Sequence, residues 1–288
     1  MRVLKDSHKD DQYVFLQDLL ERYYDLIERR IALSNQLRSN LIETFPELDA
    51  CFGQIYSRAA LSILSHVQTA GDLLKIEEAK IKKIIKKGKG RIANKQLASL
   101  IYACKETTGW KTSDCLKIII KSQVEELKFL NQQIIEFQEA LDNYSLQFEE
   151  ELDLLSSVPG ISKQISYLFL VIVGDHQRFD PKRDGKGAKR LSSYLGFGMK
   201  EYSSGSRSYK LGISKRGNSK LRGLLYMAAL SVIRYDETLK LGYQKYRDRS
   251  GSGKKGVVAL SHMLLRRCYG VLKSGKCYDP RVPISQGQ

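Results

Sequence analysis

The sequence of 288 residues contains no apolar run of the roughly 18 to 20 residues that a membrane-spanning helix needs. Its first residues, MRVLKDSHKDD, are too polar for a secretory signal peptide. We therefore expect no membrane partner and a cytoplasmic location.

Potential metal ligands are also scarce. The five cysteines are an odd number without CxxC spacing, and the four histidines are scattered along the chain. Neither a disulfide framework nor a zinc site follows from such a pattern. The sequence predicts no metal site and no cofactor held by this chain.

Acidic residues become rare after residue 150. Residues 1–150 hold 22 Lys and Arg against 22 Asp and Glu, whereas residues 151–288 hold 26 against 10. The whole net charge of +16 therefore belongs to the C-terminal half. A segment this basic favours a polyanionic partner, most often nucleic acid, over a surface kept basic for solubility alone.

The apolar pattern is that of a helical protein. Residues 12–45 carry apolar side chains at steps of three and four, Ile27 and Ile31 among them, and residues 54–104 read as shorter helices. Residues 114–150 show an a/d-type seam, which indicates a helical hairpin or coiled coil with the first helix, or dimerisation through the same seam. The predicted fold is all-α or mainly α, with a long helical spacer followed by a compact helical domain.

One stretch of the spacer, IEEAKIKKIIKKGKGR (76–91), is rich in lysine. It can contact phosphates, or it can be the solvated face of an amphipathic helix. We favour the second interpretation.

At residue 151 the pattern changes to two apolar segments joined by a Pro-Gly turn, and we predict a helix-hairpin-helix-like element. The glycine supplies the left-handed or closely approached backbone that such a turn needs. The N–H groups at the start of the second helix suit a phosphate. The predicted DNA-backbone contacts are Pro159, Gly160, Ile161 and Lys163.

The stretch KEYSSGSRSYKLGISKRGNSKLR (200–222) combines cations, serines and glycines in a predicted loop, and a helix is predicted from about residue 219 to 234. Asn218 or Ser219 can cap that helix. Cations crowd its N-terminal end and oppose the helix dipole, so a bound anion would relieve the conflict. The predicted DNA-binding residues here are Arg207, Lys210, Lys215, Arg216, Asn218, Lys220 and Arg222.

Five blocks occur in a specific order: SVPGIS (157–162), RFDPKR (178–183), LSSYLGFGMKEYSSGS (191–206), ISKRGNSKLRGLLYMAA (213–229) and VALSHMLLRRCYGVLKSGKCYD (258–279). Their order and spacing resemble the C-terminal domain of DEDD-type insertion-sequence transposases, the IS one-ten family that includes Piv-like DNA invertases. The resemblance implies a remnant of a RuvC-like domain at 1–12, a helical coiled-coil spacer at 13–150, a transposase domain at 151–279 and a tail at 280–288.

The resemblance also implies function. Family members carry out DNA transposition or site-specific recombination of an insertion sequence, and some are guided by a structured RNA. We expect DNA as a partner, and a homo-oligomer formed through the helical spacer.

A serine of the family's C-terminal domain attacks DNA and forms a phosphoserine. It matches the SSG of YSSGS, hence Ser203 or Ser204, and Ser203 is favoured because members often carry Ser-Thr-Gly here. A serine hydroxyl needs activation before it attacks. From the residues alone, a polar loop that only binds phosphates is the better interpretation, and the resemblance favours the nucleophile.

Intact family members bind Mg²⁺ through four acidic residues of an N-terminal RuvC-like domain. Here only SHKDDQ (7–12) is similar to that domain, which places Asp11 on the last acidic position and His8 on the preceding aspartate. Asp6 and Asp10 are out of register. A lone carboxylate cannot build a two-metal site. We therefore expect an N-terminally truncated transposase that binds DNA but cannot cleave it alone, with Met1 as an internal start of a longer reading frame.

Two other functions remain open. A non-catalytic nucleic-acid-binding protein would occupy element ends or regulate a full-length transposase through the spacer. An unrelated RNA-binding or structural helical protein is the third alternative, and the order of the blocks argues against it.

Overall fold

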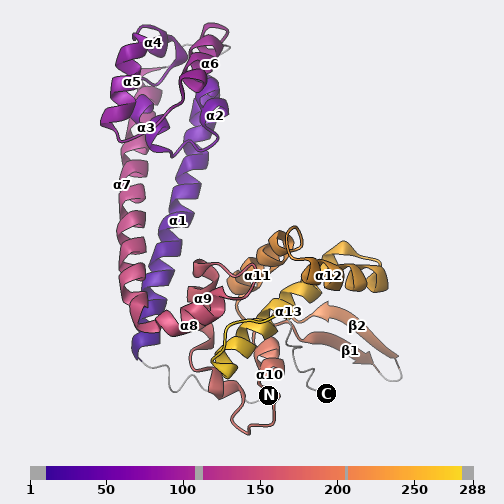
Figure 1. The fold of residues 1–288 in the computed structure, drawn as a ribbon. Coiled ribbons are helices and arrows are strands. Elements are labelled where there is room, and N and C mark those ends of the chain that lie inside the picture. Colours follow the sequence, from indigo (N-terminus) through magenta and orange to yellow (C-terminus); the bar gives the residue numbers. More distant parts are fainter. Residues whose placement is uncertain (1–10, 108–112, 205–206, 281–288) are drawn as a thin grey trace. The chain divides into compact units, whose positions relative to one another are not determined.

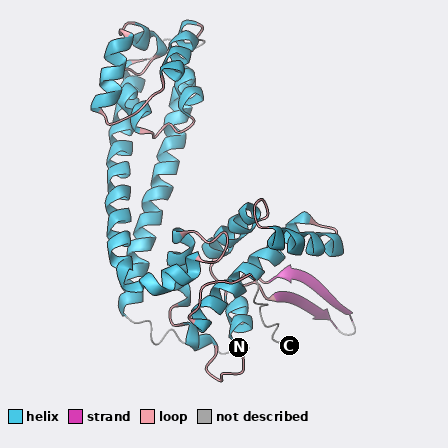
Figure 2. Ribbon diagram, in the orientation of Figure 1, coloured by secondary structure: helices cyan, strands magenta, loops and turns pink. Residues whose placement is uncertain are grey.

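The computed structural model describes residues 11–107, 113–204 and 207–280, and helices account for most of them (Figure 2). The prediction of a mainly helical fold is confirmed. The chain divides into two compact units, Glu21–Leu141 and a second one made of Met1–Leu20 with Asp142–Gln288. In the described part of the chain, no helix is both long and apolar enough to cross a membrane.

The unit Glu21–Leu141 is built on two long helices, α1 (Asp11–Thr44) and α7 (Asp114–Tyr144), which lie side by side (Figure 1). Arg30 Nη1 donates to Asn131 Oδ1 at 3.3 Å, and Asn40 Nδ2 donates to Gln123 Oε1 at 2.9 Å. Later residues of α1 thus meet earlier residues of α7, so the two helices are antiparallel. The shorter helices of this unit are α2 (Pro46–Phe52), α3 (Arg58–Leu64), α4 (Ala70–Leu74), α5 (Glu78–Lys87) and α6 (Asn94–Lys105).

The predicted apolar seam is buried along α7 but only in part along α1. The buried residues of α7 are Ile120, Val124, Leu127, Leu130, Ile134 and Leu141. On α1 the prediction was wrong for Ile31, which is 50% exposed, while Leu33 and Leu37 are buried. Two successive steps of four residues rotate by about 80° around a helix of 3.6 residues per turn. The steps from Tyr23 through Ile27 therefore carry Ile31 off the buried face.

The second unit is organised around its last helix, α13 (Gly253–Ser274), which packs against the 3-10 helix η2 (His176–Phe179) and against four α-helices of the unit. Those α-helices are α8 (Glu149–Ser156), α10 (Gly187–Tyr194), α11 (Ser219–Val232) and α12 (Glu237–Ser250). Helix α9 (Lys163–Val173) is buried from Ile165 to Val173, as expected of a helix that is apolar all round. Two short 3-10 helices complete the helical part, η1 (Ser145–Phe148) and η2 (His176–Phe179).

The loop expected after residue 200 is instead a two-stranded hairpin. Strand β1 (Met199–Ser204) pairs antiparallel with β2 (Arg207–Ile213), and Tyr202 lies opposite Tyr209. Serine and glycine in this stretch suggested a loop, but tyrosine is a residue type that favours strands. Strand pairing depends on the partner segment, which the composition of either strand alone does not reveal.

His262 of α13 joins the core of the second unit to the segment before the hairpin. Its Nε2 lies 2.7 Å from Ser192 Oγ, and its ring stacks on Phe197 with centroids 5.7 Å apart. Ser192 Oγ donates to Ala188 O at 2.6 Å, so the histidine tautomer with a proton on Nε2 fits the pair. Burial lowers the pKa of His262, and the nearby charge of Arg266 lowers it further.

We expect acid to weaken the second unit through His262. Its pKa is below the ordinary value of 6.5, so its contribution to the free energy of unfolding is complete above pH 6.5 and is lost as the pH falls toward the folded-state pKa. Denaturant unfolding of the chain between about pH 7.5 and about pH 5 should show this loss, and His262→Gln should reduce it. The control is His66→Gln in the other unit, where the loss should persist. An undiminished loss in His262→Gln would contradict the assignment.

Candidate nucleic-acid interface

Two loops of the second unit meet beside the hairpin, and we call residues 195–198 and 214–217 the loop junction. Lys215 N donates to Gly196 O at 3.1 Å. Gly196 has φ +79°, and a Cβ there would collide with the carbonyl oxygen of Arg216. Both observations require glycine at this position. The close approach of the two backbones fixes the two loops against one another.

Arg222, on the first turns of α11, binds the loop junction from the helix side. Its Nη1 donates to Leu195 O at 2.9 Å, to Gly217 O at 3.1 Å and to Arg216 O at 3.2 Å. Its Nη2 donates to Lys215 O at 2.9 Å. Hydrogen bonds from a charged donor are stronger than those between neutral groups. Sequence reasoning assigned Arg222 to DNA, whereas its guanidinium is bonded to four carbonyls of the protein's own backbone.

Exposed cationic side chains lie at the loop junction and at the start of α11, next to the carbonyls that Arg222 binds. Lys215 and Arg216 have exposed side chains, and Lys215 adopts a left-handed backbone with φ +56°. Asn218 Oδ1 accepts from Leu221 N at 2.9 Å, which confirms Asn218 as the cap of α11. Lys220 is exposed on the first turn. These residues surround a helix N-terminus, the end at which the helix dipole favours an anion.

The hairpin carries the two candidate nucleophiles. Ser203 and Ser204 are the last two residues of β1, and Ser204 lies opposite Arg207 at the start of β2. The side chains of both serines, and those of Arg207 and Lys210, lie outside the described residues. The hairpin continues directly into the loop junction at both ends, so the serines and the exposed cations belong to one continuous segment.

The acidic candidates are at the other end of the chain. Asp11 is the first residue of α1, and its side chain lies outside the described residues, as do His8, Asp6 and Asp10. Elsewhere, no group of three or more His, Cys, Asp or Glu in the described part of the chain could hold a metal ion. The described residues therefore do not supply the Mg²⁺ site that the resemblance implies for an intact family member.

The Pro-Gly turn lies between α8 and α9 and packs on α11. Gly160 has φ +83°, and a Cβ there would lie 3.2 Å from Ala228 O and 3.3 Å from Val232 Cβ. The glycine is thus needed both for its backbone conformation and for the close approach. These contacts are at the C-terminal end of α11, roughly 15 to 20 Å along the helix from its cap at 1.5 Å per residue. The structure places the two predicted DNA-contacting groups at opposite ends of one helix.

The other predicted residues of the turn differ in what they offer a ligand. Pro159 is partly exposed, but Ile161 is only 7% exposed, so its side chain belongs to the core. Lys163 Nζ lies 2.7 Å from Asp142 Oδ1, and the hydrogen bond to this carboxylate raises the pKa of Lys163. Its charge is therefore already paired within the protein.

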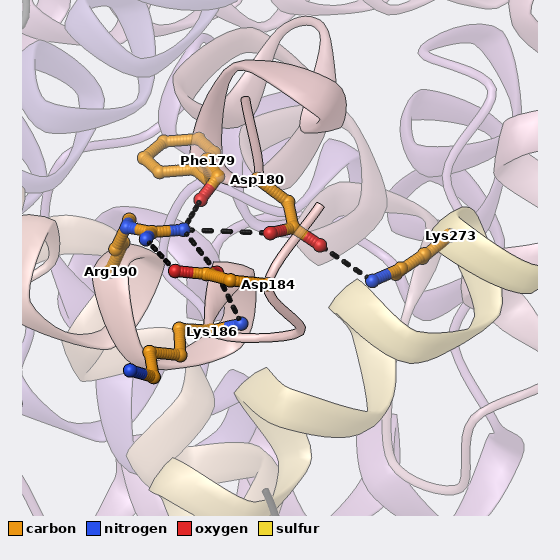
Figure 3. A network of polar contacts seen from close by, with 6 residues as sticks. All are labelled: Phe179, Asp180, Asp184, Lys186, Arg190 and Lys273. Carbon is orange, nitrogen blue, oxygen red and sulfur yellow. Dashed lines mark hydrogen bonds and ion pairs between the residues drawn. The ribbon is translucent and has the colours of Figure 1, made fainter. Parts of the chain in front are cut away.

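Sequence reasoning missed a polar network around Asp180 (Figure 3). Asp180 Oδ2 accepts from Lys273 Nζ of α13 at 2.7 Å, and Arg190 Nη1 donates to Asp184 Oδ1 at 2.9 Å and to Phe179 O at 3.1 Å. The Arg190 guanidinium holds the pKa of Asp184 well below its usual range. The network connects residues 178–190 to α13. The feature of the sequence that could have indicated it is the presence of two aspartates within a basic segment.

The chain has recognisable relatives. Residues 152–244 match the family model described as Transposase IS116/IS110/IS902 family. The chain is 23% identical over 264 residues to the "Insertion element IS110 uncharacterized 43.6 kDa protein" of Streptomyces coelicolor, which covers 90% of this chain and 63% of that protein. This chain thus spans just under two thirds of that relative's length.

Two further relatives match shorter stretches of the chain at higher identity. The "Pilin gene-inverting protein" of Moraxella lacunata is 30% identical over 146 residues, covering 49% of this chain and 43% of the relative. The "Transposase for insertion sequence element IS1111A" of Coxiella burnetii is 30% identical over 115 residues, covering 38% of this chain and 30% of the relative.

The family model covers the Pro-Gly turn, the hairpin, the loop junction and Arg222 in one uninterrupted match. Two of the relatives are named as a transposase and as a gene-inverting protein. Residues 152–244 are thus similar to the IS116/IS110/IS902 transposase family.

Proposed function

We propose that this chain takes part in DNA transposition or site-specific recombination of an insertion sequence. The observation that carries the proposal is the loop junction, where exposed Lys215 and Arg216 are held at the N-terminus of α11 beside the serine-bearing hairpin. The names of the relatives support the same class of reaction. We place the activity in the cytoplasm.

The DNA duplex would lie along α11. A duplex carries one negative charge per about 1.7 Å of its axis, so a helix roughly 20 Å long faces several phosphates. The loop junction supplies cations at one end of α11, and the Pro-Gly turn supplies backbone at the other end. Both would contact the phosphate backbone, which positions a duplex without reading its sequence.

Ser203 is our proposed nucleophile, with Ser204 as the alternative. Its Oγ would attack the phosphorus of a phosphodiester, forming an O–P bond while the bond to the leaving deoxyribose oxygen breaks. The Oγ proton must pass to a base, and the leaving oxygen must take up a proton. Lys215 and Arg216 would stabilise the added negative charge at phosphorus.

Among the described residues, no group of three or more His, Cys, Asp or Glu could hold a metal ion, and we propose that the base comes from elsewhere. We therefore propose that this chain, as it stands, binds DNA and does not cleave it. The alternative is a non-catalytic protein that occupies element ends or regulates a full-length transposase. The exposed cations of the loop junction favour this alternative too, because they would bind DNA without cleaving it. Adding the chain to a recombination assay with a full-length relative separates the two, because a regulator lowers the yield and a catalytic partner raises it.

Self-association through the spacer is also part of the proposal. Ile118 and Phe129 are 67% and 61% exposed and are eleven residues apart on α7, which places them on one face. Exposed apolar side chains in such a row favour a second copy as partner. Sedimentation of the chain would detect the dimer. A guide RNA is a further possible partner, and filter binding with the transcript of the element would test it.

We predict that Lys215→Gln/Arg216→Gln weakens duplex DNA binding. The double variant removes two cations from the loop junction without touching Arg222, so the slope of log affinity against log salt should fall by about one to two. Fluorescence anisotropy over a salt series measures this slope. The control, Lys105→Gln/Lys121→Gln, removes two exposed lysines of the other unit and should leave it unchanged. Equal losses in the two variants would contradict a specific contact at the loop junction.

We predict that Ser203→Ala abolishes recombination while DNA affinity stays near that of the wild type. The substitution is introduced at the matching serine of a full-length relative, because this chain is proposed not to cleave alone. Ser204→Ala is the matched control and should retain activity. Retained recombination in Ser203→Ala would exclude Ser203, and loss only in Ser204→Ala would transfer the role to Ser204.

A further inference from the structure

The unit Glu21–Leu141 contains a cavity of about 450 Å³, and all of its lining residues belong to this unit. Its walls come from α3, from the end of α5 with the residues that follow it, and from the middle of α7. Four cationic side chains line it, and no carboxylate does. They are Arg58, Lys87, Lys89 and Lys128.

The cations of the cavity are largely uncompensated. In the part of the chain that the structure describes, Arg58, Lys87 and Lys89 form no ion pair, and all three are exposed. Lys128 pairs with Glu125 at 2.8 Å, but Glu125 does not line the cavity. Like charges held close together repel one another, which favours an anion between them.

The chain brings these lysines to α3 through two glycines. A Cβ at Gly88 would collide with Ser62 Oγ, and a Cβ at Gly90 would lie 2.8 Å from Ala59 Cα. Lys89, between them, has a left-handed backbone with φ +55°. Such a conformation is uncommon for a residue other than glycine. The segment is therefore shaped so that it lies tightly on α3 and presents its lysines at the cavity.

One side of the cavity wall is apolar, and this suggests which kind of molecule carries the anion. Leu61, Ile84 and Ile135 give the cavity an apolar side, and its volume falls within the range of roughly 300 to 1,000 Å³ that is typical of small-molecule sites. A nucleotide combines a phosphate with a flat ring of low polarity on its faces. We propose that this cavity binds one nucleotide of a nucleic-acid chain, with the phosphate on the lysines and the base against the apolar side.

The positive charge of the cavity lining is explained only in part by favourable interaction with a helix dipole. Lys87 is in the last turn of α5, where a cation is favourable without any ligand. Arg58, however, is the first residue of α3, and Lys128 lies in the interior of α7. Residues 51–100 hold ten Lys and Arg against three Asp and Glu, an excess that the balanced charge of the whole N-terminal half conceals.

The cavity proposal depends on the proposed function in one respect. The proposed function is the reason to expect a nucleotide within a nucleic-acid chain and not a free nucleotide. The test is photo-crosslinking of the full chain to a single-stranded oligonucleotide that carries a photoreactive base, with peptide mapping of the products. We expect crosslinks within residues 58–89 or 128–135, in addition to those within 151–279. Lys87→Gln/Lys89→Gln should remove most of the first group and retain the second.

The matched control is Lys80→Gln/Lys83→Gln, which removes two exposed lysines of the same helix that do not line the cavity. It should leave the crosslinks unchanged. Gln132→Glu is a second variant, which places a carboxylate at the exposed cavity wall with little change of shape, and it should also suppress the crosslinks. Circular dichroism of each variant checks that the helices are intact.

Each outcome decides one of the two proposals. Crosslinks confined to residues 151–279, or an equal loss in the control variant, would overturn the cavity proposal and leave the proposed function standing. Crosslinks at the cavity alone would support the cavity and count against DNA binding by the loop junction. Protection of the chain against thermal unfolding by a mononucleotide, without oligonucleotide crosslinks, would identify a free nucleotide as the ligand and overturn the nucleic-acid source.

Discussion

The guanidinium of Arg222 holds four backbone carbonyls of the loop junction, and the geometry of the candidate interface depends on this contact. Carbonyl oxygens that converge on one point repel one another unless a multiple donor lies between them. The fork of donors on an arginine suits that task, whereas a lysine ammonium is a single point charge. With the junction fixed, Lys215 and Arg216 are presented at the start of α11 and the hairpin emerges from a defined backbone.

The charge of the C-terminal half therefore has two roles. Some cations are paired with carboxylates of the protein itself, as Lys273 is with Asp180 and Lys163 is with Asp142. Others, including Lys215 and Arg216, are exposed at the helix N-terminus. Net charge predicts a polyanionic partner but does not distinguish these roles, because pairing depends on which residues the fold brings together.

Much of the fold could be predicted from the sequence, because helical periodicity and capping are local. The Asn218 cap and the left-handed Gly160 followed from patterns within a few residues. The strands did not, since Tyr202 meets Tyr209 only through cross-strand pairing. The role of Arg222 could not be predicted either, because Leu195 O, one of its acceptors, is 27 residues away in the sequence. The cavity of the N-terminal half was hidden for the same reason, since its lysines meet Lys128 only in the folded chain.

The most direct test of this account is amide hydrogen exchange of the chain with Arg222→Lys, which keeps the charge and removes the fork of donors. If Arg222 fixes the loop junction, the amides of residues 195–198 and 214–217 should exchange about tenfold faster or more in this variant, which corresponds to about 1.4 kcal/mol of local stability. The amides of α13 should keep their wild-type rates. Unchanged exchange in the loop junction, or an equal acceleration throughout the second unit, would contradict the claim that Arg222 fixes this interface.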